Sequence, residues 1–163
     1  MDSFDRAILG ILQQDSSLPL NEIANRVGLS PTPCWNRIRK MEELGIITGR
    51  VALLDAAQLG LGVTVFVSIE TSDHSEGWLS RFAAAITTMP EVVDVYRMSG
   101  DVDYMLRVVV PGIDAYDGFY RRLIKVVPLK NVSSRFAMEK VKATTALPLD
   151  DSPVFKSRKK AQK

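Results

Sequence analysis

The chain contains a single cysteine, Cys34, and a single histidine, His74, among its 163 residues. A lone cysteine cannot form an internal disulfide, and one histidine leaves no ligand cluster for a zinc site. The longest run without a charged side chain, 56–69, includes Gln, Gly, Thr and Ser and falls short of the roughly 20 apolar residues of a membrane span. We therefore expect no disulfide, metal, cofactor or membrane partner.

A secretory signal and an excess of one charge are also missing. The amino end, MDSFDRAIL, mixes acids and a base where a signal peptide needs a basic start and an unbroken apolar run, so we expect a cytoplasmic protein. The net charge is only +2. Its surplus lies in 150–163, a segment without hydrophobic periodicity that we predict to be a disordered basic tail. The tail cations are Lys156, Arg158, Lys159, Lys160 and Lys163.

Three short helices are predicted near the amino end. Apolar residues recur at helical spacing over 4–12 and 20–27. Ser30 followed by Pro31 is a typical start for a third helix that ends near Leu44. Two helices joined by a short turn that contains glycine are typical of a helix-turn-helix.

We accordingly assign 1–50 to a winged helix-turn-helix domain. The apolar, β-branched segment 46–54 indicates a short hairpin wing or an extended strand, and 51–62 is predicted to be a linker strand.

From residue 63 the periodicity alternates between strand and helix, in the order βαββαβ. This order is typical of a ferredoxin-like domain, assigned to 63–149, and makes the fold class α+β. The strands are expected over 63–69, 92–98, 104–110 and 132–141, and the helices over 78–89 and 115–126. The sheet face that lacks helices must be covered, and the alternation of Val65, Val67 and Ile69 predicts that a second copy covers it in a homodimer.

The third helix has two chemically different sides. At 100° per residue, Cys34, Ile38 and Met41 share an arc that should face the core. The opposite side presents hydrogen-bonding and cationic groups of the kind that read the DNA major groove. A solvated helix face has a similar composition, but the helix-turn-helix spacing favours DNA reading. Trp35 lies between the two sides and is expected to pack against the first helix or the wing.

The segment 98–104 is a turn between two predicted strands. A glycine with exposed amides and nearby carboxylates can hold a zwitterion, with amides for its carboxylate and an aspartate for its ammonium. A plain hairpin turn explains the same residues, and the residue pattern alone favours that simpler interpretation. His74, in the polar segment 72–75, is interpreted as a solvated loop residue.

A set of residues spread in order along 1–149 matches the pattern of one known family. The matching residues are Asp2, Asp5, Arg6, Ile8, Leu9, Ile23, Ala24, Val27, Gly28, Leu29, Ser30, Arg37, Ile38, Glu42, Gly45, Ile46, Ile47, Leu59, Gly60, Pro90, Val92, Gly100, Asp103, Tyr104, Lys140, Leu147, Pro148 and Leu149. By these matches the chain resembles the Lrp/AsnC family of transcriptional regulators, also called feast/famine regulators. The resemblance implies a winged helix-turn-helix, a linker strand and a ferredoxin-like domain that dimerises, often assembles into octamers and binds amino acids.

The same resemblance carries two sets of site residues onto this chain. The implied effector site lies between dimers, and 135–137 is a further candidate segment. The implied DNA-binding residues are Ser30, Thr32, Pro33, Asn36, Arg37, Arg39 and Lys40, and the implied effector-binding residues are Ser99, Gly100, Asp101, Asp103 and Tyr104.

We therefore expect a sequence-specific regulator that binds double-stranded DNA, responds to a small amino acid or related metabolite, and is not an enzyme. The alternative is a ferredoxin-like metabolite-binding protein or enzyme whose helical domain serves assembly. The sequence offers no catalytic constellation in support of that alternative.

Overall fold

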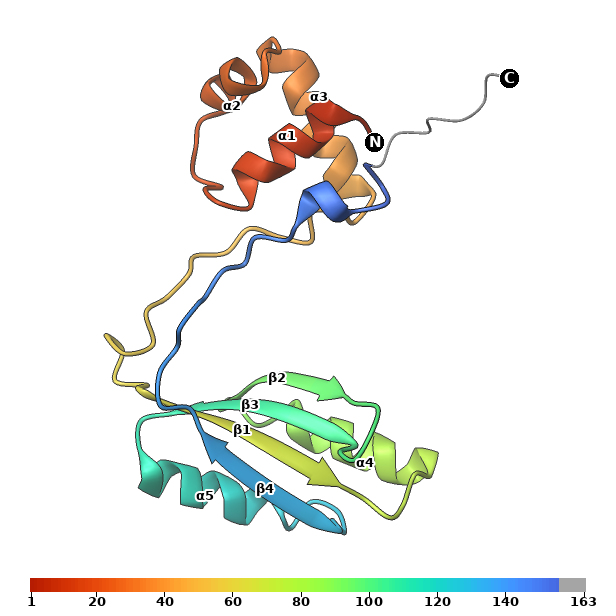
Figure 1. The fold of residues 1–163 in the computed structure, drawn as a ribbon, viewed down its shortest axis with the longest axis vertical. Coiled ribbons are helices and arrows are strands. Elements are labelled where there is room, and N and C mark those ends of the chain that lie inside the picture. The colour runs from red at the N-terminus through yellow and green to blue at the C-terminus, as the bar shows by residue number, and fades with distance from the viewer. Residues whose placement is uncertain (156–163) are drawn as a thin grey trace. The chain divides into compact units, whose positions relative to one another are not determined.

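The computed structural model describes residues 1–155 and divides into two compact units, each described by itself below (Figure 1). The helical unit contains Met1–Ala52 together with the chain from Lys142 onward, and the sheet unit contains Leu53–Val141. The five cations of the predicted tail lie outside the described residues. Within the described part of the chain, no helix is long and apolar enough to cross a membrane.

The three predicted helices of the helical unit are confirmed as α1 (Ser3–Leu12), α2 (Leu20–Val27) and α3 (Pro31–Glu43). A reciprocal capping box starts α1, because the Asp5 amide donates to the Asp2 carboxylate while the Asp2 amide donates to the Asp5 carboxylate. The helices enclose one apolar core, whose buried members are Ile8, Ile23, Ala24, Cys34, Ile38 and Met41.

The turn between α2 and α3 depends on Gly28. Its φ of 70° is left-handed, which a residue with a Cβ adopts only with strain, and it lets the Leu29 amide donate back to the Ala24 carbonyl. Ala24 and Cys34 are fully buried, so that small side chains allow the two helices to approach. Ser30 is the N-cap residue of α3, but its side chain makes no capping hydrogen bond.

Within the single chain described, 46–62 contains no strand, so one copy alone forms neither the predicted wing nor the predicted linker strand. A strand needs a neighbour for its amide and carbonyl groups, and none of the described residues pairs with this segment. Val51, Leu53 and Leu54 consequently remain 77%, 73% and 75% exposed.

The sheet unit has the ferredoxin-like order that the sequence predicts. An antiparallel sheet with strand order β2-β3-β1-β4 carries both helices on the same face (Figure 1). Its elements are β1 (Val63–Glu70), α4 (Glu76–Ile86), β2 (Val92–Arg97), β3 (Tyr104–Val110), α5 (Ile113–Leu123) and β4 (Asn131–Phe136).

Several element boundaries differ from prediction, among them the start of α4 and the end of β4. Helix α4 begins at Glu76 instead of 78, because the Ser75 hydroxyl accepts from the Trp78 amide and caps the helix two residues earlier. Strand β4 ends at Phe136 instead of 141: the Ala137 amide still donates to the Thr64 carbonyl at 2.9 Å, but β1 begins at Val63 and has no strand residue to pair with the segment beyond 138.

The alternating residues Val65, Val67 and Ile69 point toward the helices and are fully buried, so they do not form the open face. The prediction that they cover the sheet against a second copy is wrong, because strand alternation has two sides and burial selects one of them. The open side of β1 instead carries Phe66, whose cross-strand partners are Arg107 and Arg135.

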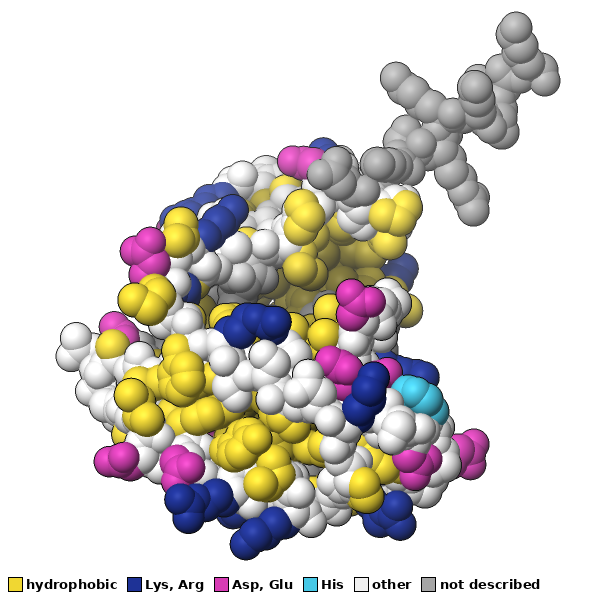
Figure 2. Space-filling view, turned by 60° about the horizontal axis from the view of Figure 1, so that its bottom comes forward, with side chains coloured by type: hydrophobic (Ala, Val, Ile, Leu, Met, Phe, Trp, Pro, Cys, Tyr) yellow, Lys and Arg dark blue, Asp and Glu magenta, His cyan; other side chains and the backbone are white. Residues whose placement is uncertain are grey.

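The surface of the sheet unit is unusually apolar in places. Figure 2 shows hydrophobic side chains gathered on the viewed face, with Lys and Arg side chains toward its edge. Large apolar side chains that remain exposed in this unit include Phe66, Tyr96, Ile113, Ile124 and Phe136. Apolar surface of this kind favours association with another surface.

The chain beyond Lys142 returns to the helical unit, although the sequence assigned it partly to the ferredoxin-like domain and partly to the disordered tail. The Gln13 side chain accepts from the Leu147 amide at 2.9 Å and donates to the Leu147 carbonyl at 3.1 Å. Arg6 pairs with Asp150 at 3.1 Å, within the 3-10 helix η1 (Leu149–Asp151). The segment around Leu147 and Asp150 thus contacts α1, and the disorder of the tail beyond it stays a prediction.

Candidate DNA-reading and effector-binding sites

The packing of α3 determines which side chains it exposes. Cys34, Ile38 and Met41 are buried against α1 and α2, as the helical periodicity predicts. The remaining sides of the helix therefore face solvent. Of the implied DNA-binding residues, the exposed ones are Ser30, Thr32, Pro33, Asn36, Arg39 and Lys40.

Arg37, unlike the other implied DNA-binding residues, is half-buried and engaged by carboxylates of the first helix. Its Nη1 pairs with Asp5 at 2.7 Å and with Asp2 at 2.8 Å, and its guanidinium lies over the Phe4 ring. These carboxylates raise the pKa of Arg37, while the Asp5 amide and Arg37 together lower the pKa of Asp2. These contacts fasten α3 to the start of α1, and the role of Arg37 in DNA reading stays a prediction.

Arg39 lies on the opposite flank of α3 and is exposed. Its Nε donates to Glu43 Oε1 at 3.0 Å, and its guanidinium stacks over the Trp35 ring at 5.2 Å from the centroid. Trp35 is 46% exposed and does not pack into the core. It lines a groove of ≈ 220 Å³ that also includes Leu18 and Leu20, which corrects the expected packing against the first helix or the wing.

The loop between β2 and β3 is closed by a hydrogen bond from the Met98 amide to the Asp103 carbonyl at 2.8 Å. Gly100 has a φ of 112°, a left-handed conformation that requires glycine. Ser99, Gly100 and Asp101 are exposed. The tip of the loop, including Asp101, is therefore open to solvent.

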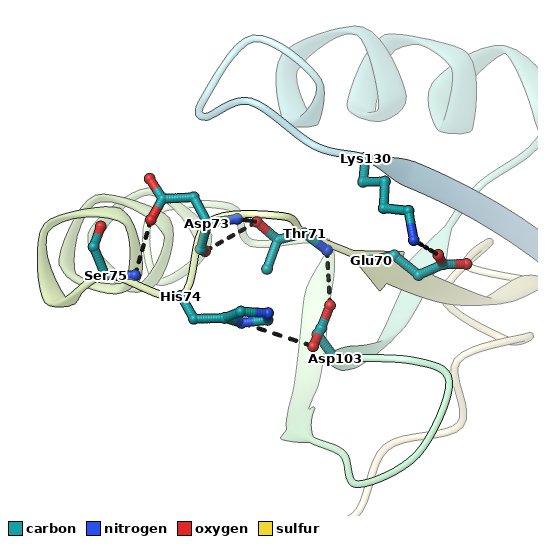
Figure 3. A network of polar contacts seen from close by, with 7 residues as sticks. All are labelled: Glu70, Thr71, Asp73, His74, Ser75, Asp103 and Lys130. Carbon is teal, nitrogen blue, oxygen red and sulfur yellow. Dashed lines mark hydrogen bonds and ion pairs between the residues drawn. The ribbon is translucent and has the colours of Figure 1, made fainter.

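Asp103 lies at the closed base of this loop and not at its exposed tip. Its Oδ2 accepts from the Thr71 amide at 2.7 Å, and its Oδ1 lies 3.9 Å from His74 Nδ1 (Figure 3). The Asp103 amide donates to the Ile69 carbonyl at 3.0 Å. The half-buried carboxylate therefore joins the β2–β3 loop to the segment that follows β1.

That segment has its own hydrogen bonds, which sequence reasoning missed. The Thr71 hydroxyl bonds both the amide and the carbonyl of Asp73 at 3.1 Å, and Asp73 Oδ1 accepts from the Ser75 amide at 2.9 Å (Figure 3). The Ser75 contacts lower the pKa of Asp73. The spacing Thr71, Asp73, Ser75 is a signal for consecutive side-chain turns that precede a helix. His74 is 62% exposed at the side chain, in agreement with a loop residue.

The remaining implied effector positions, Tyr104 and the segment 135–137, belong to strands of the sheet or directly follow one. Tyr104 is 7% exposed, with its ring 5.7 Å from Trp78 and 4.9 Å from Phe82, so it forms core and not loop surface. Within 135–137, Arg135 donates to Ser68 at 2.7 Å on the open face, whereas Phe136 packs edge-on against Tyr116 beside α5. Arg135 and Phe136 therefore lie on opposite faces of the sheet.

Comparison with known proteins assigns both units. Residues 1–48 match a winged helix-turn-helix DNA-binding domain, and residues 64–147 match the Lrp/AsnC ligand binding domain. The DNA-binding transcriptional activator DecR of Escherichia coli is 48% identical over 92% of this chain and 99% of its own length. The glutamate uptake regulatory protein of Zymomonas mobilis is 43% identical over 98% and 97%, respectively.

Solved structures agree with these sequence relatives. An AsnC family transcriptional regulator from Agrobacterium tumefaciens is 60% identical, with a TM-score of 0.89 over 92% of this chain and 98% of its own. The regulator NMB0573 of Neisseria meningitidis, solved as an L-Met complex, is 30% identical with a TM-score of 0.88 over 92% and 97%. The resemblance seen in the sequence is confirmed, and the chain belongs to the Lrp/AsnC family of DNA-binding transcriptional regulators.

Proposed function

We propose that this protein is a sequence-specific regulator, and not an enzyme, that reads the DNA major groove with the exposed side of α3. The observation that carries the proposal is the orientation of α3, which buries its apolar side and leaves amide, hydroxyl and cationic groups outward. Such groups distinguish base edges. The proposed contacts are Ser30, Thr32, Pro33, Asn36, Arg39 and Lys40. Its relatives act on DNA, so we place it in the cytoplasm.

The proposed effector is a small amino acid bound at the β2–β3 loop. The exposed amides around Gly100 suit its carboxylate, and the Asp101 carboxylate suits its ammonium. The ligand-binding match of this unit and the L-Met complex of the Neisseria regulator support an amino acid as the class of ligand. Asp103 contributes indirectly, by holding the loop through Thr71.

The functional form that we propose is a homodimer, with assembly of dimers up to an octamer. One chain leaves Phe66 exposed on the sheet and leaves Val51, Leu53 and Leu54 without strand neighbours. A second copy can cover both features, and a two-fold interface repeats each contact twice. Placing the effector loop between dimers would link ligand binding to assembly.

DNA binding is tested by footprinting the full chain on the promoter region of its own gene. We expect a protected site whose length matches a dimer, and Asn36→Ala should relax the base preference at one position in each half-site. A lost base contact costs about 1 to 3 kcal/mol. Absence of protection at low salt would refute the proposed regulator.

The effector is tested by a thermal-shift screen against the twenty amino acids, followed by calorimetry with the best ligand. Ligand that binds only the folded chain raises its melting temperature. The same titration, followed by sedimentation, reports whether the ligand changes the assembly. No shift with any amino acid would direct the search to other metabolites.

A further inference from the structure

The guanidinium of Arg39 is held on two sides by residues of its own helix. Glu43, one turn later, accepts from Nε at 3.0 Å, and Trp35, one turn earlier, supports the flat face of the group at 5.2 Å. Spacings of four residues place all three side chains on one flank of α3. A long, flexible side chain is thereby restricted in an exposed position.

The two contacts leave one edge of the guanidinium unused. Among the described residues, the hydrogen bond of Arg39 goes to Glu43 through Nε, so Nη1 and Nη2 keep their donors for another acceptor. These two nitrogens form the end-on fork that matches two neighbouring acceptors. In the major groove, guanine offers such a pair in O6 and N7.

Glu43 also biases the choice between base and backbone. Its carboxylate lies beside the guanidinium, so a phosphate that approached Arg39 would meet a like charge at the same place. A neutral guanine edge meets no such repulsion. Lys40, on the same exposed side, has no carboxylate within ion-pairing distance among the described residues and remains suited to phosphate.

Arg37 provides an internal comparison. It occupies the same helix two residues earlier, but its Nη1 is consumed by Asp2 and Asp5. The difference lies in which atoms are engaged: the end of the guanidinium in Arg37, and only its Nε in Arg39. Sequence composition does not distinguish these two arginines.

We propose that Trp35 and Glu43 are positioning residues that hold Arg39 to read a guanine in the DNA site. The proposal rests on the proposed function of α3 and specifies which base this helix reads and which side chains set that preference. Stacking on Trp35 limits the rotamers of Arg39 before DNA arrives, which lowers the entropy lost on binding. Glu43 orients the fork by fixing Nε.

The test is enrichment of bound sequences from random double-stranded DNA with the full chain and its variants. The informative variants are Trp35→Leu, which removes the π face, and Glu43→Ala, which removes the acceptor. The matching conservative variants are Trp35→Phe and Glu43→Gln. Glu42→Gln is the control, since Glu42 is a neighbouring exposed carboxylate that pairs with Arg50 instead.

Wild-type protein should enrich a guanine at one position of each half-site. We expect Trp35→Leu and Glu43→Ala to reduce that preference about tenfold, close to the effect of Arg39→Ala. Trp35→Phe, Glu43→Gln and Glu42→Gln should retain most of it. The melting temperature should change little, because Trp35 and Glu43 are both exposed. The low-salt affinity for random DNA should not fall, and Glu43→Ala should raise it, because that variant lacks a charge that repels phosphate.

A second measurement addresses the base atom itself. Replacing the selected guanine by 7-deazaguanine removes N7, so wild-type affinity should fall, whereas Arg39→Ala should be indifferent to the change. Trp35→Leu should show a reduced penalty. Unchanged guanine preference in both Trp35→Leu and Glu43→Ala would overturn the positioning role. A wild-type protein that enriches no sequence would instead overturn the proposed function, and the guanine reading with it.

Discussion

The exposed side of α3 and the β2–β3 loop differ in whether their polar side chains are engaged by other groups of the same chain. On α3, Asn36 and Lys40 project from a helix whose orientation is set by buried Cys34 and Ile38, so their donors stay available. In the loop, the Asp103 carboxylate is engaged by the Thr71 amide. The packed helix therefore leaves its polar side chains exposed, whereas the loop uses one of its carboxylates to hold its own conformation.

The largest effect is expected from a substitution that removes the core packing beneath α3. Ile38→Ala creates a cavity in the small helical core and should destabilise that unit by about 2 to 5 kcal/mol. We expect loss of DNA binding while the sheet unit keeps its own thermal transition and ligand response. Calorimetry of the variant with and without the effector measures both. If calorimetry of the variant shows that the thermal transition of the sheet unit is lost as well, the two units do not unfold separately.

Asp101 and Asp103 separate ligand contact from loop support. Asp101→Ala should weaken effector affinity by about one to two orders of magnitude with unchanged stability, since a charge-assisted contact is worth about 1.5 to 3 kcal/mol. Asp103→Ala should lower affinity and also destabilise the sheet unit, because the buried Thr71 amide loses its acceptor.

Titration calorimetry beside thermal unfolding distinguishes the two variants. Asp103→Asn is the control, because its amide oxygen can still accept from Thr71. An Asp103→Ala protein with normal stability and weakened binding would return Asp103 to direct ligand contact.

The five cations of the predicted basic tail, all within 156–163, give a third test on the DNA side. Truncation after Phe155 should weaken binding to all sequences alike, by about tenfold at low salt, and flatten the dependence of affinity on salt. Anisotropy titrations at several salt concentrations measure both quantities. A full-length chain with serine at the five cationic positions serves as a control for length. Identical slopes in the truncated and full chains would show that the tail does not contact phosphates.

Arg37 should affect stability more than base preference. Arg37→Ala is expected to cost about 1 kcal/mol of unfolding free energy, since the pair is partly exposed, and to leave the enriched sequence unchanged. A lowered pKa of Asp2 means that the folded state binds this proton more weakly than the unfolded chain does. The resulting stabilisation is complete above about pH 4 and is lost as the pH falls below it.

Acid unfolding curves of wild type and Asp2→Asn test this sign. The wild-type advantage should be present at neutral pH and should shrink at acidic pH. A constant difference at every pH would assign the effect to helix capping alone.

The smallest expected effect concerns the contact between α1 and the C-terminal segment. Gln13→Ala should cost only a few tenths of a kcal/mol, because the contact is solvent-exposed, but it should accelerate hydrogen exchange at the Leu147 amide. Gln14→Ala, at an exposed neighbouring position, is the control. Unchanged exchange at Leu147 would mean that the segment is not held by Gln13 in solution.

Local signals in the sequence were sufficient for most elements. The apolar spacing of α1, α2 and α3, the left-handed Gly28 and the βαββαβ order are all properties of short windows, and the structure confirms them. Local signals failed where pairing or contact with a distant segment determines the structure. The segment 46–62 has strand composition but no strand to pair with, and 142–155 has no periodicity yet returns to α1.

The same distinction, between local signals and contacts with distant segments, applies to the candidate sites. Helical periodicity alone predicts that Asn36, Arg39 and Lys40 face outward. It cannot predict that Arg37 pairs with the start of α1, because Asp2 and Asp5 lie more than thirty positions away in the sequence. The same limit applies to Tyr104, whose burial depends on Trp78 and Phe82 of α4.

The sequence by itself determined the order of elements, the family and the helix that we propose to face DNA, because periodicity, caps and glycine turns act within a few residues. Only the tertiary structure decided which of two nearby arginines pairs with the start of α1, which side of β1 is buried and what the Asp103 carboxylate binds. Each of these depends on groups brought together from distant segments, and hydrogen bonds and ion pairs form only with the partner that folding places within reach.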